Sequence, residues 1–312
     1  MPFLHGSGRR GHGSVSADLL VVGLGGNALS PPRGPLTFAD ERAAIALAAG
    51  ELSGLARAGA RLLVVHGNGP QVGRLLQAVG FGDPGSLDVH VAQTQGELGY
   101  LLTEALELRL GMPCAALVTR VVVAEDDPAF AAPSKPVGGV LGAAPASAPS
   151  VHTANGSGFR RVVASPRPIA VVEEAAIAQL LRRHHVIAGG GGGVPLAQRA
   201  GGRIPVAAVV DKDWVASLLA RRLDAGRLVF VTDVENAFEG FGGAQPRALP
   251  RLACDEARAR LARGEFAPGS MGPKVEAAVE FTEATGRPSV IAPLGGIERA
   301  LRGAGGTTII GG

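Results

Sequence analysis

The sequence is poor in cysteine and in aromatic residues, and each shortage excludes a class of protein. Its two cysteines, Cys114 and Cys254, lie far apart without the spacing of a metal site, so neither a disulfide framework nor a zinc site is predicted. Aromatic residues for base stacking make up only 4% of the chain and the net charge is +3, so no nucleic-acid partner is expected. A reducing cytoplasm is the expected location.

Long hydrophobic runs are also missing. The apolar run at residues 19–24 is too short for the core of a signal peptide or for a membrane span, so we expect neither export nor a membrane partner. Residues 1–17 are rich in Gly, Ser, His and Arg and are predicted to form a disordered tail. The remaining residues, 18–312, are long and apolar enough to fold around a sizeable core.

Short β-rich runs alternate with helical patterns along the chain. This alternation predicts an α/β fold, a three-layer αβα sandwich around a mostly parallel sheet. Strands are predicted at residues 19–24, 61–65, 115–123, 186–188, 228–231 and 289–291, and helices at 38–58, 93–110, 173–184, 212–223, 255–263 and 273–285. Residues 125–165, rich in Pro, Ala, Gly and Ser, interrupt the pattern and are predicted to form a small protruding lid subdomain, because long irregular stretches inside a domain are usually functional.

Glycine-rich turns follow three of the predicted strands, at residues 23–28, 66–73 and 189–193. Such turns let backbone amides approach an anion before a helix begins, and two of them after sequential strands suggest a site for two facing anionic groups. The first turn also fits the dinucleotide pattern G-x-G-x-x-A. A dinucleotide-binding oxidoreductase, however, would need an acidic residue about 20 residues further on, and here the second strand comes later and ends in His66.

Lysine is the third scarce residue, since only three of the 30 Lys and Arg residues are lysine. Lys135 lies in the interrupting segment, Lys212 stands between Asp211 and Asp213 at a predicted helix start, and Lys274 follows a Gly- and Pro-rich turn into another helix. Surface ion pairs would explain any one of them. Because all three occur in such motifs, and because a compact ammonium suits a tight phosphate pocket, we predict that they bind phosphate oxygens.

Together these motifs resemble the carbamate kinases of the amino-acid-kinase superfamily. The resemblance extends from residue 20 almost to the C-terminus, through residues 25–28, 66–73, 94–96, 133–138, 165–169, 189–193, 211–213 and 266–274. It implies reversible phosphoryl transfer between ATP and carbamate, giving ADP and carbamoyl phosphate, with ATP synthesis during catabolism of arginine or other carbamoyl compounds. It also implies Mg²⁺ bound with the nucleotide, a homodimer, and an amino-acid-kinase domain at 18–312 with the lid subdomain inserted at 125–165.

The resemblance implies a role for each candidate residue. Lys212 and Lys274 would neutralise charge on the transferring and bridging oxygens, Lys135 would close over them from the lid, and Asp211 would align the lysines. Asn27 completes the expected catalytic set, and no protein side chain is expected to bind metal. Phosphate and substrate are expected at Gly25, Gly26, Gly67, Asn68, Gly69, Gly191 and Gly192, and the nucleotide at Thr232, Asp233, Ala267, Pro268 and Met271.

Two alternatives stay open at this point. One is a sibling kinase that phosphorylates another carboxylate, against which the missing Gly-x-Lys turn at 25–27 argues, because most of the superfamily carries a lysine there. The other is a non-catalytic sensor of carbamoyl phosphate or nucleotide, against which the presence of all three lysines and Asp211 argues.

Overall fold

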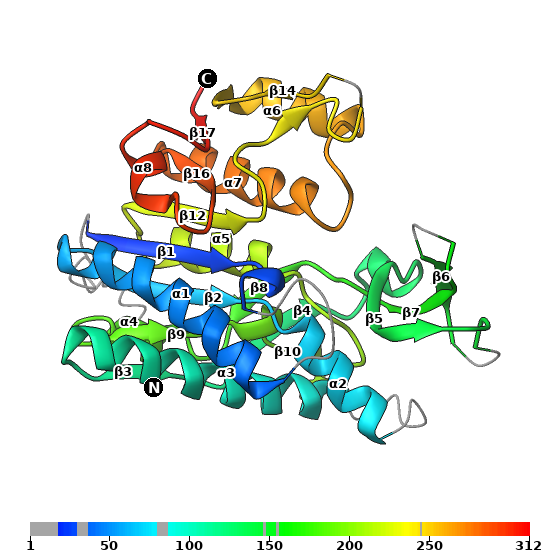
Figure 1. Cartoon of the computed structure of the whole chain (residues 1–312). Coiled ribbons are helices and arrows are strands. Elements are labelled where there is room, and N and C mark those ends of the chain that lie inside the picture. Colours follow the sequence, from blue (N-terminus) through cyan, green and yellow to red (C-terminus); the bar gives the residue numbers. More distant parts are fainter. Residues whose placement is uncertain (1–17, 30–36, 80–86, 146–147, 154–155, 244) are drawn as a thin grey trace, which may run out of the picture.

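The computed structural model describes residues 18–29, 37–79, 87–145, 148–153, 156–243 and 245–312 (Figure 1). The predicted disordered tail, residues 1–17, lies outside the described residues. A large sheet runs through the centre of the molecule, and all its neighbouring strands are parallel except for one antiparallel pair, β16 with β17. Within the described residues its spatial order is β15 (Arg251–Ala253), β17 (Thr307–Ile310), β16 (Ser289–Pro293), β12 (Arg227–Thr232), β1 (Leu19–Leu24), β2 (Arg61–His66), β9 (His185–Ile187) and β3 (Cys114–Ala116).

Helices cover both faces of this sheet, which confirms the predicted αβα sandwich. Because side chains alternate along a strand, Leu20 and Val22 of β1 pack on one face with α1 (Phe38–Arg57) and α3 (Leu87–Leu110). Leu19 and Val21 pack on the other face with α5 (Lys212–Arg222) and α7 (Met271–Thr285). The other helices are α2 (Gly69–Val79), α4 (Glu174–Leu180), α6 (Cys254–Ala262) and α8 (Ile297–Leu301).

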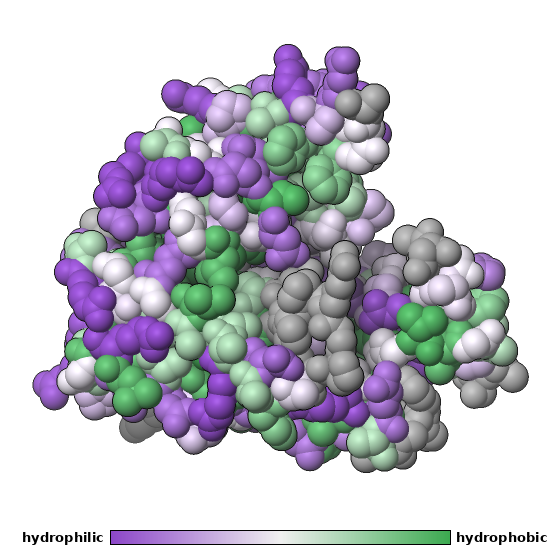
Figure 2. All heavy atoms as spheres, viewed as in Figure 1, coloured by the Kyte–Doolittle hydropathy of each residue, from purple (hydrophilic) through white to green (hydrophobic). Residues whose placement is uncertain are grey.

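Smaller sheets flank the main one. A mixed sheet has the order β11 (Gly202–Pro205), β10 (Val194–Arg199), β4 (Arg120–Ala124) and β8 (Pro168–Val171). An antiparallel sheet of β5 (Lys135–Leu141), β7 (Phe159–Val163) and β6 (Ser150–His152) projects from the body, and a notch separates it from the part that carries β13 (Phe238–Glu239), β14 (Arg247–Ala248) and α6 (Figures 1 and 2).

Some predicted elements differ from the structure. The strand predicted at 115–123 is two strands in different sheets, because residues 117–119 leave the main sheet: the Thr119 amide donates to the Gln95 side chain, and the Thr119 carbonyl accepts from Val194. The helix predicted at 93–110 begins six residues earlier, and the one predicted at 173–184 ends at Leu180. The segment at 125–165 is not irregular, since it contains β5, β6 and β7.

Candidate active site

The candidate site lies where the central strands β1, β2 and β12 end, the edge at which parallel α/β sheets bind ligands. A short 3-10 helix, Gly26–Leu29, follows β1, and α2 follows β2 from Gly69. The two turns touch: a Cβ at Gly67 would come within 2.8 Å of the Gly26 amide nitrogen and 3.4 Å of the Lys212 side chain. Two glycine-rich turns and a lysine therefore meet at one place.

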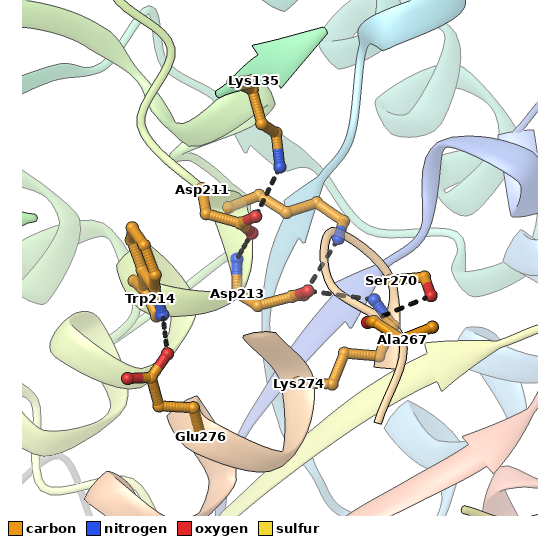
Figure 3. Close-up of polar contacts among 9 residues, drawn as sticks. Lys135, Asp211, Asp213, Trp214, Ala267, Ser270, Lys274 and Glu276 are labelled. Atoms are coloured by element: carbon orange, nitrogen blue, oxygen red, sulfur yellow. Dashed lines mark hydrogen bonds and ion pairs between the residues drawn. The ribbon is translucent and has the colours of Figure 1, made fainter. Parts of the chain in front are cut away.

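Lys212 and Lys274 share one carboxylate, that of Asp213 (Figure 3). The Lys212 ammonium donates to Asp213 Oδ1 and the Lys274 ammonium to Asp213 Oδ2, each over 2.9 Å. The exposed fraction is 13% for the side chain of Lys212, 8% for Lys274 and 3% for Asp213. The first turns of α5 and α7 pack together and so bring the two ammonium groups, from residues 62 apart in the sequence, to one carboxylate.

Lys135 joins the cluster from β5 through Asp211. Its ammonium donates to Asp211 Oδ2 over 2.5 Å, while Asp211 Oδ1 accepts the Asp213 amide over 3.0 Å as the N-cap of α5. One aspartate therefore begins the helix that carries Lys212 and also fixes the lysine of the protruding sheet. The five side chains form a chain from β5 to α7, and three ammonium groups against two carboxylates leave a net positive charge.

Burial and charge act against each other in the cluster. Burial alone would raise the pKa of Asp211, but the charges of Lys135 and Lys212 and the hydrogen bonds that Asp211 accepts hold that pKa well below its ordinary value. Burial would lower the pKa of Lys212, yet Asp213 and Asp211 raise it above its usual value. Burial, together with the charge of Lys212, lowers the pKa of Lys274 although Asp213 opposes this.

These opposite shifts at two lysines on one carboxylate have a physical reason. Lys212 lies beside two carboxylates, and their charges raise its pKa. Lys274 contacts Asp213, but the neighbouring positive charge of Lys212 helps to lower the pKa of Lys274. The two lysines share one buried carboxylate, so a further anion beside them would stabilise their charge. Oxygens of a phosphoryl group are such an anion.

The glycine run at 189–193 is buried and wraps closely around the cluster. Gly189, Gly191 and Gly192 have φ of +69°, +64° and +85°, which favours glycine. A Cβ at Gly191 would reach within 2.1 Å of the Asn68 amide, and one at Gly192 within 1.9 Å of the Val210 carbonyl, just before Asp211. Glycine is therefore required for the backbone to pass between the second turn and the start of α5.

Polar side chains fix these turns from behind. Asn68 donates to the Thr94 hydroxyl over 2.8 Å. The side-chain amide of Gln95 donates from its nitrogen to the Thr119 carbonyl and accepts the Thr119 amide at its oxygen. His66, 1% exposed, donates from Nδ1 to the Gly67 carbonyl over 3.0 Å. Burial lowers the pKa of His66 to about 4, so its ring is neutral at pH 7 and adds no charge to the site.

The residues expected at the nucleotide lie on two connections beside the cluster. Thr232 ends β12 and Asp233 follows it. Ala267 and Pro268 are exposed on the connection into α7, which Met271 begins, three residues before Lys274. The Ala267 carbonyl accepts the Ser270 and Gly272 amides, which closes this connection into a tight turn. Figure 3 shows the Ser270 hydroxyl on the same carbonyl. Asn27 lies in the 3-10 helix after β1, and its side chain is outside the described part of the structure.

Asp213 is the residue that the sequence prediction missed. The sequence prediction assigns alignment of the lysines to Asp211. In the structure Asp211 accepts a hydrogen bond from Lys135 alone among the three lysines, and Asp213 accepts hydrogen bonds from both Lys212 and Lys274. The sequence feature that could have identified Asp213 is the pair of aspartates on either side of Lys212. Spacing alone does not reveal which of them faces α7, because that depends on how two distant helices pack.

Known proteins resemble this chain over nearly its whole length. The model of the amino acid kinase family matches residues 18–293. A carbamate kinase of Halobacterium salinarum is 39% identical over 93% of this chain and 97% of its own, and one of Escherichia coli strain K12 is 41% identical over 93% and 98%. The structure of a carbamate kinase from Giardia lamblia bound to AMP-PNP superposes with a TM-score of 0.85 at 35% identity, covering 95% of this chain and 99% of that one.

Proposed function

This chain belongs to the amino acid kinase family, and we infer that it is a carbamate kinase, which moves a phosphoryl group between ATP and carbamate. The observation that carries this conclusion is the cluster of Lys135, Lys212 and Lys274 on two carboxylates, where the central strands end. Catalysis of phosphoryl transfer requires that the reactants are positioned and that negative charge on the phosphoryl oxygens is neutralised, and three clustered ammonium groups can do both.

The acceptor needs no strong base, because a carbamate anion already carries a nucleophilic oxygen. Asp211, with its lowered pKa, stays ionised at neutral pH and positions lysine instead of taking a proton. We propose that Lys212 and Lys274 stabilise the charge on the transferring and bridging oxygens and that Lys135 closes the site from β5. Backbone amides at the turns of Gly25, Gly26, Gly67 and Gly69, with Asn27 and Asn68, would hold the phosphoryl group and the acceptor.

ATP or ADP would lie beside this cluster, along Thr232 and Asp233 after β12 and the turn before α7. Mg²⁺ would arrive with the nucleotide, because both carboxylates of the cluster are engaged by lysines and, within the described residues, no three His, Cys, Asp or Glu side chains gather as ligands. Mg²⁺ prefers oxygen ligands, which the phosphates of the nucleotide and water would provide. When bound, it would neutralise further negative charge on the phosphates.

The assembly and setting are further parts of the proposal. We propose a homodimer that uses the outer faces of α1 and α3, where Leu47, Tyr100 and Leu108 are 70%, 57% and 81% exposed and Figure 2 shows hydrophobic patches. No described helix has the length and apolarity to cross a membrane. We propose a cytoplasmic enzyme that makes ATP from carbamoyl phosphate during catabolism of arginine or other carbamoyl compounds.

The test is Mg²⁺-dependent formation of ATP from ADP, with carbamoyl phosphate, acetyl phosphate and acylglutamyl phosphate as alternative donors. Selective use of carbamoyl phosphate is the expected result. Preference for another acyl phosphate would identify a sibling kinase. Nucleotide binding without turnover on any donor would identify a sensor, and either outcome refutes the proposed function.

A further inference from the structure

A second cluster of polar contacts joins α5 and α7, the two helices that carry Lys212 and Lys274, on the sides that face away from these lysines. Its centre is the single tryptophan of the chain, Trp214 on α5, whose indole N–H donates to Glu276 Oε2 on α7 over 3.1 Å (Figure 3). The Arg167 guanidinium lies over the Trp214 ring, 4.0 Å from its centroid, and also donates to Glu276. The other terminal nitrogen of Arg167, Nη1, pairs with Glu280 over 3.0 Å.

The sequence spacing connects this cluster with the catalytic lysines. Trp214 is two residues after Lys212, and Glu276 is two residues after Lys274. Two residues turn an α-helix through roughly 200°, so each helix presents its lysine on one side and its cluster residue on nearly the opposite side. The contact between Trp214 and Glu276 therefore joins the first turns of α5 and α7 on the sides away from their lysines.

Arg167 connects the same cluster with the protruding sheet. It lies on the connection from β7 to β8, directly before β8. Its amide donates to Asp127 Oδ2 over 2.9 Å, and Asp127 lies on the other connection, between β4 and β5, where its Oδ1 caps the 3-10 helix Pro128–Phe130. One arginine thus joins both connections of the sheet that carries Lys135 to the helices that carry the other two lysines.

We propose that Arg167, Trp214 and Glu276 form a clamp that positions the three lysines relative to one another for phosphoryl transfer. The clamp residues are positioning residues, because they contact the helices and connections that present the lysines and not the lysines themselves. The side chains of Arg167 and Glu276 are 42% and 36% exposed, and ion pairs at such positions contribute little to global stability. Their loss should therefore alter turnover far more than folding. This inference rests on the proposed carbamate kinase activity.

The first test compares Arg167→Ala with a matched control, Arg258→Ala. Arg258 on α6 pairs with Glu283, which lies on α7 farther from the lysines, and the two side chains are 53% and 37% exposed. For Arg167→Ala we expect kcat with carbamoyl phosphate and ADP to fall about tenfold with KM values within twofold, since small misplacement of catalytic groups costs rate. Arg167→Lys, which keeps the charge, should recover part of kcat, and Arg258→Ala should match the wild type.

The second test does not depend on turnover. Because the chain has three lysines, ¹³Cε-lysine labelling gives three side-chain NMR signals, one for each cluster ammonium. We expect Arg167→Ala and Glu276→Gln to shift the signals of Lys212 and Lys274, and Arg258→Ala to leave them in place. In Glu276→Gln, which keeps Arg167, emission of the single tryptophan reports whether the arginine has left its ring.

The two tests separate this inference from the proposed function. If the wild type does not use carbamoyl phosphate, the proposed function fails, while unshifted lysine signals in Arg167→Ala would overturn the clamp itself. A wild-type kcat in Arg167→Ala also overturns it. Equal losses of kcat in Arg167→Ala and Arg258→Ala, with matching drops in Tm, would show a purely structural role and would overturn it too.

Discussion

Replacing Asp213 with Asn removes the charge that Lys212 and Lys274 share but keeps the size of the side chain. Asp213 is 3% exposed, and each ammonium lies 2.9 Å from one of its oxygens. Breaking a buried ion pair by removing one partner costs roughly 3–5 kcal/mol, because a charge stays buried without compensation. Lys274 can reduce that cost by releasing its proton, since its pKa is already lowered. We therefore expect the free energy of unfolding to fall by about 3 kcal/mol.

The same substitution should impair catalysis by more than the loss of stability explains. Losing a preorganised electrostatic group costs roughly 10²–10³-fold in kcat. The Asp213 charge raises the pKa of Lys274, so its removal lowers that pKa further, and a lysine loses its proton as pH rises. We expect the alkaline decline of kcat to begin at lower pH in Asp213→Asn than in the wild type.

The assay is steady-state ATP formation from ADP and carbamoyl phosphate across pH 6–10, beside urea unfolding. Asp224→Asn is the control, because Asp224 is 61% exposed, pairs with Arg287, and has a φ of +55° that Asn tolerates. It should leave kcat and the alkaline decline unchanged. A kcat in Asp213→Asn within threefold of the wild type, with an unshifted alkaline decline, would refute the reasoning.

Three further predictions follow from the site. Lys135→Ala should lower kcat by about 10²-fold or more in the ATP-forming assay and should also lower Tm, because it leaves the buried carboxylate of Asp211, 7% exposed, without its nearest ammonium; an unchanged kcat would remove Lys135 from the mechanism. The pKa of His66 is about 4 in the folded protein against 6.5 in the unfolded chain, so between these pH values the unfolded chain binds more protons. Urea unfolding should therefore show that His66 makes the protein about 2 kcal/mol less stable at pH 4.5 than at pH 7. His66→Gln should abolish this difference. Gly192→Ala should reduce the yield of folded protein, because its Cβ would lie 1.9 Å from the Val210 carbonyl at a φ of +85°, whereas Gly201→Ala, with open space around it, should express and melt like the wild type.

The sequence predicts the fold best where local signals and tertiary structure agree. The strand at 19–24 was predicted with its observed bounds, because an apolar run ends abruptly in glycines. The helix at 212–223 was predicted to within one residue, because Asp211 is an N-cap and no glycine or proline follows before its end. The strand at 115–123 was wrong because Thr119 and Arg120, which interrupt the apolar run, do not by themselves show that the chain changes sheets there.

Within the site, the sequence located the lysines but not all their partners. Glycine runs and scarce lysines are local signals, and the structure brings Lys135, Lys212 and Lys274 together as expected. The place of Asp213 between two lysines depends on the packing of α5 against α7, which joins residues 61 positions apart. The stacking of Arg167 on Trp214 depends on where the connection before β8 meets α5, and the pairing of Arg167 with Glu276 joins residues 109 positions apart. Such long-range contacts leave no periodicity in the sequence.

We propose that the lysine cluster stabilises the phosphoryl group as it passes from carbamoyl phosphate to ADP. The most direct test is Mg²⁺-dependent ATP formation by the wild type, by Lys212→Ala, and by Arg222→Ala, an exposed cation at the other end of α5. We predict selective turnover of carbamoyl phosphate by the wild type and by Arg222→Ala, and a rate at least about 10³-fold lower for Lys212→Ala. Wild-type turnover in Lys212→Ala, or none with carbamoyl phosphate in the wild type, would contradict the account.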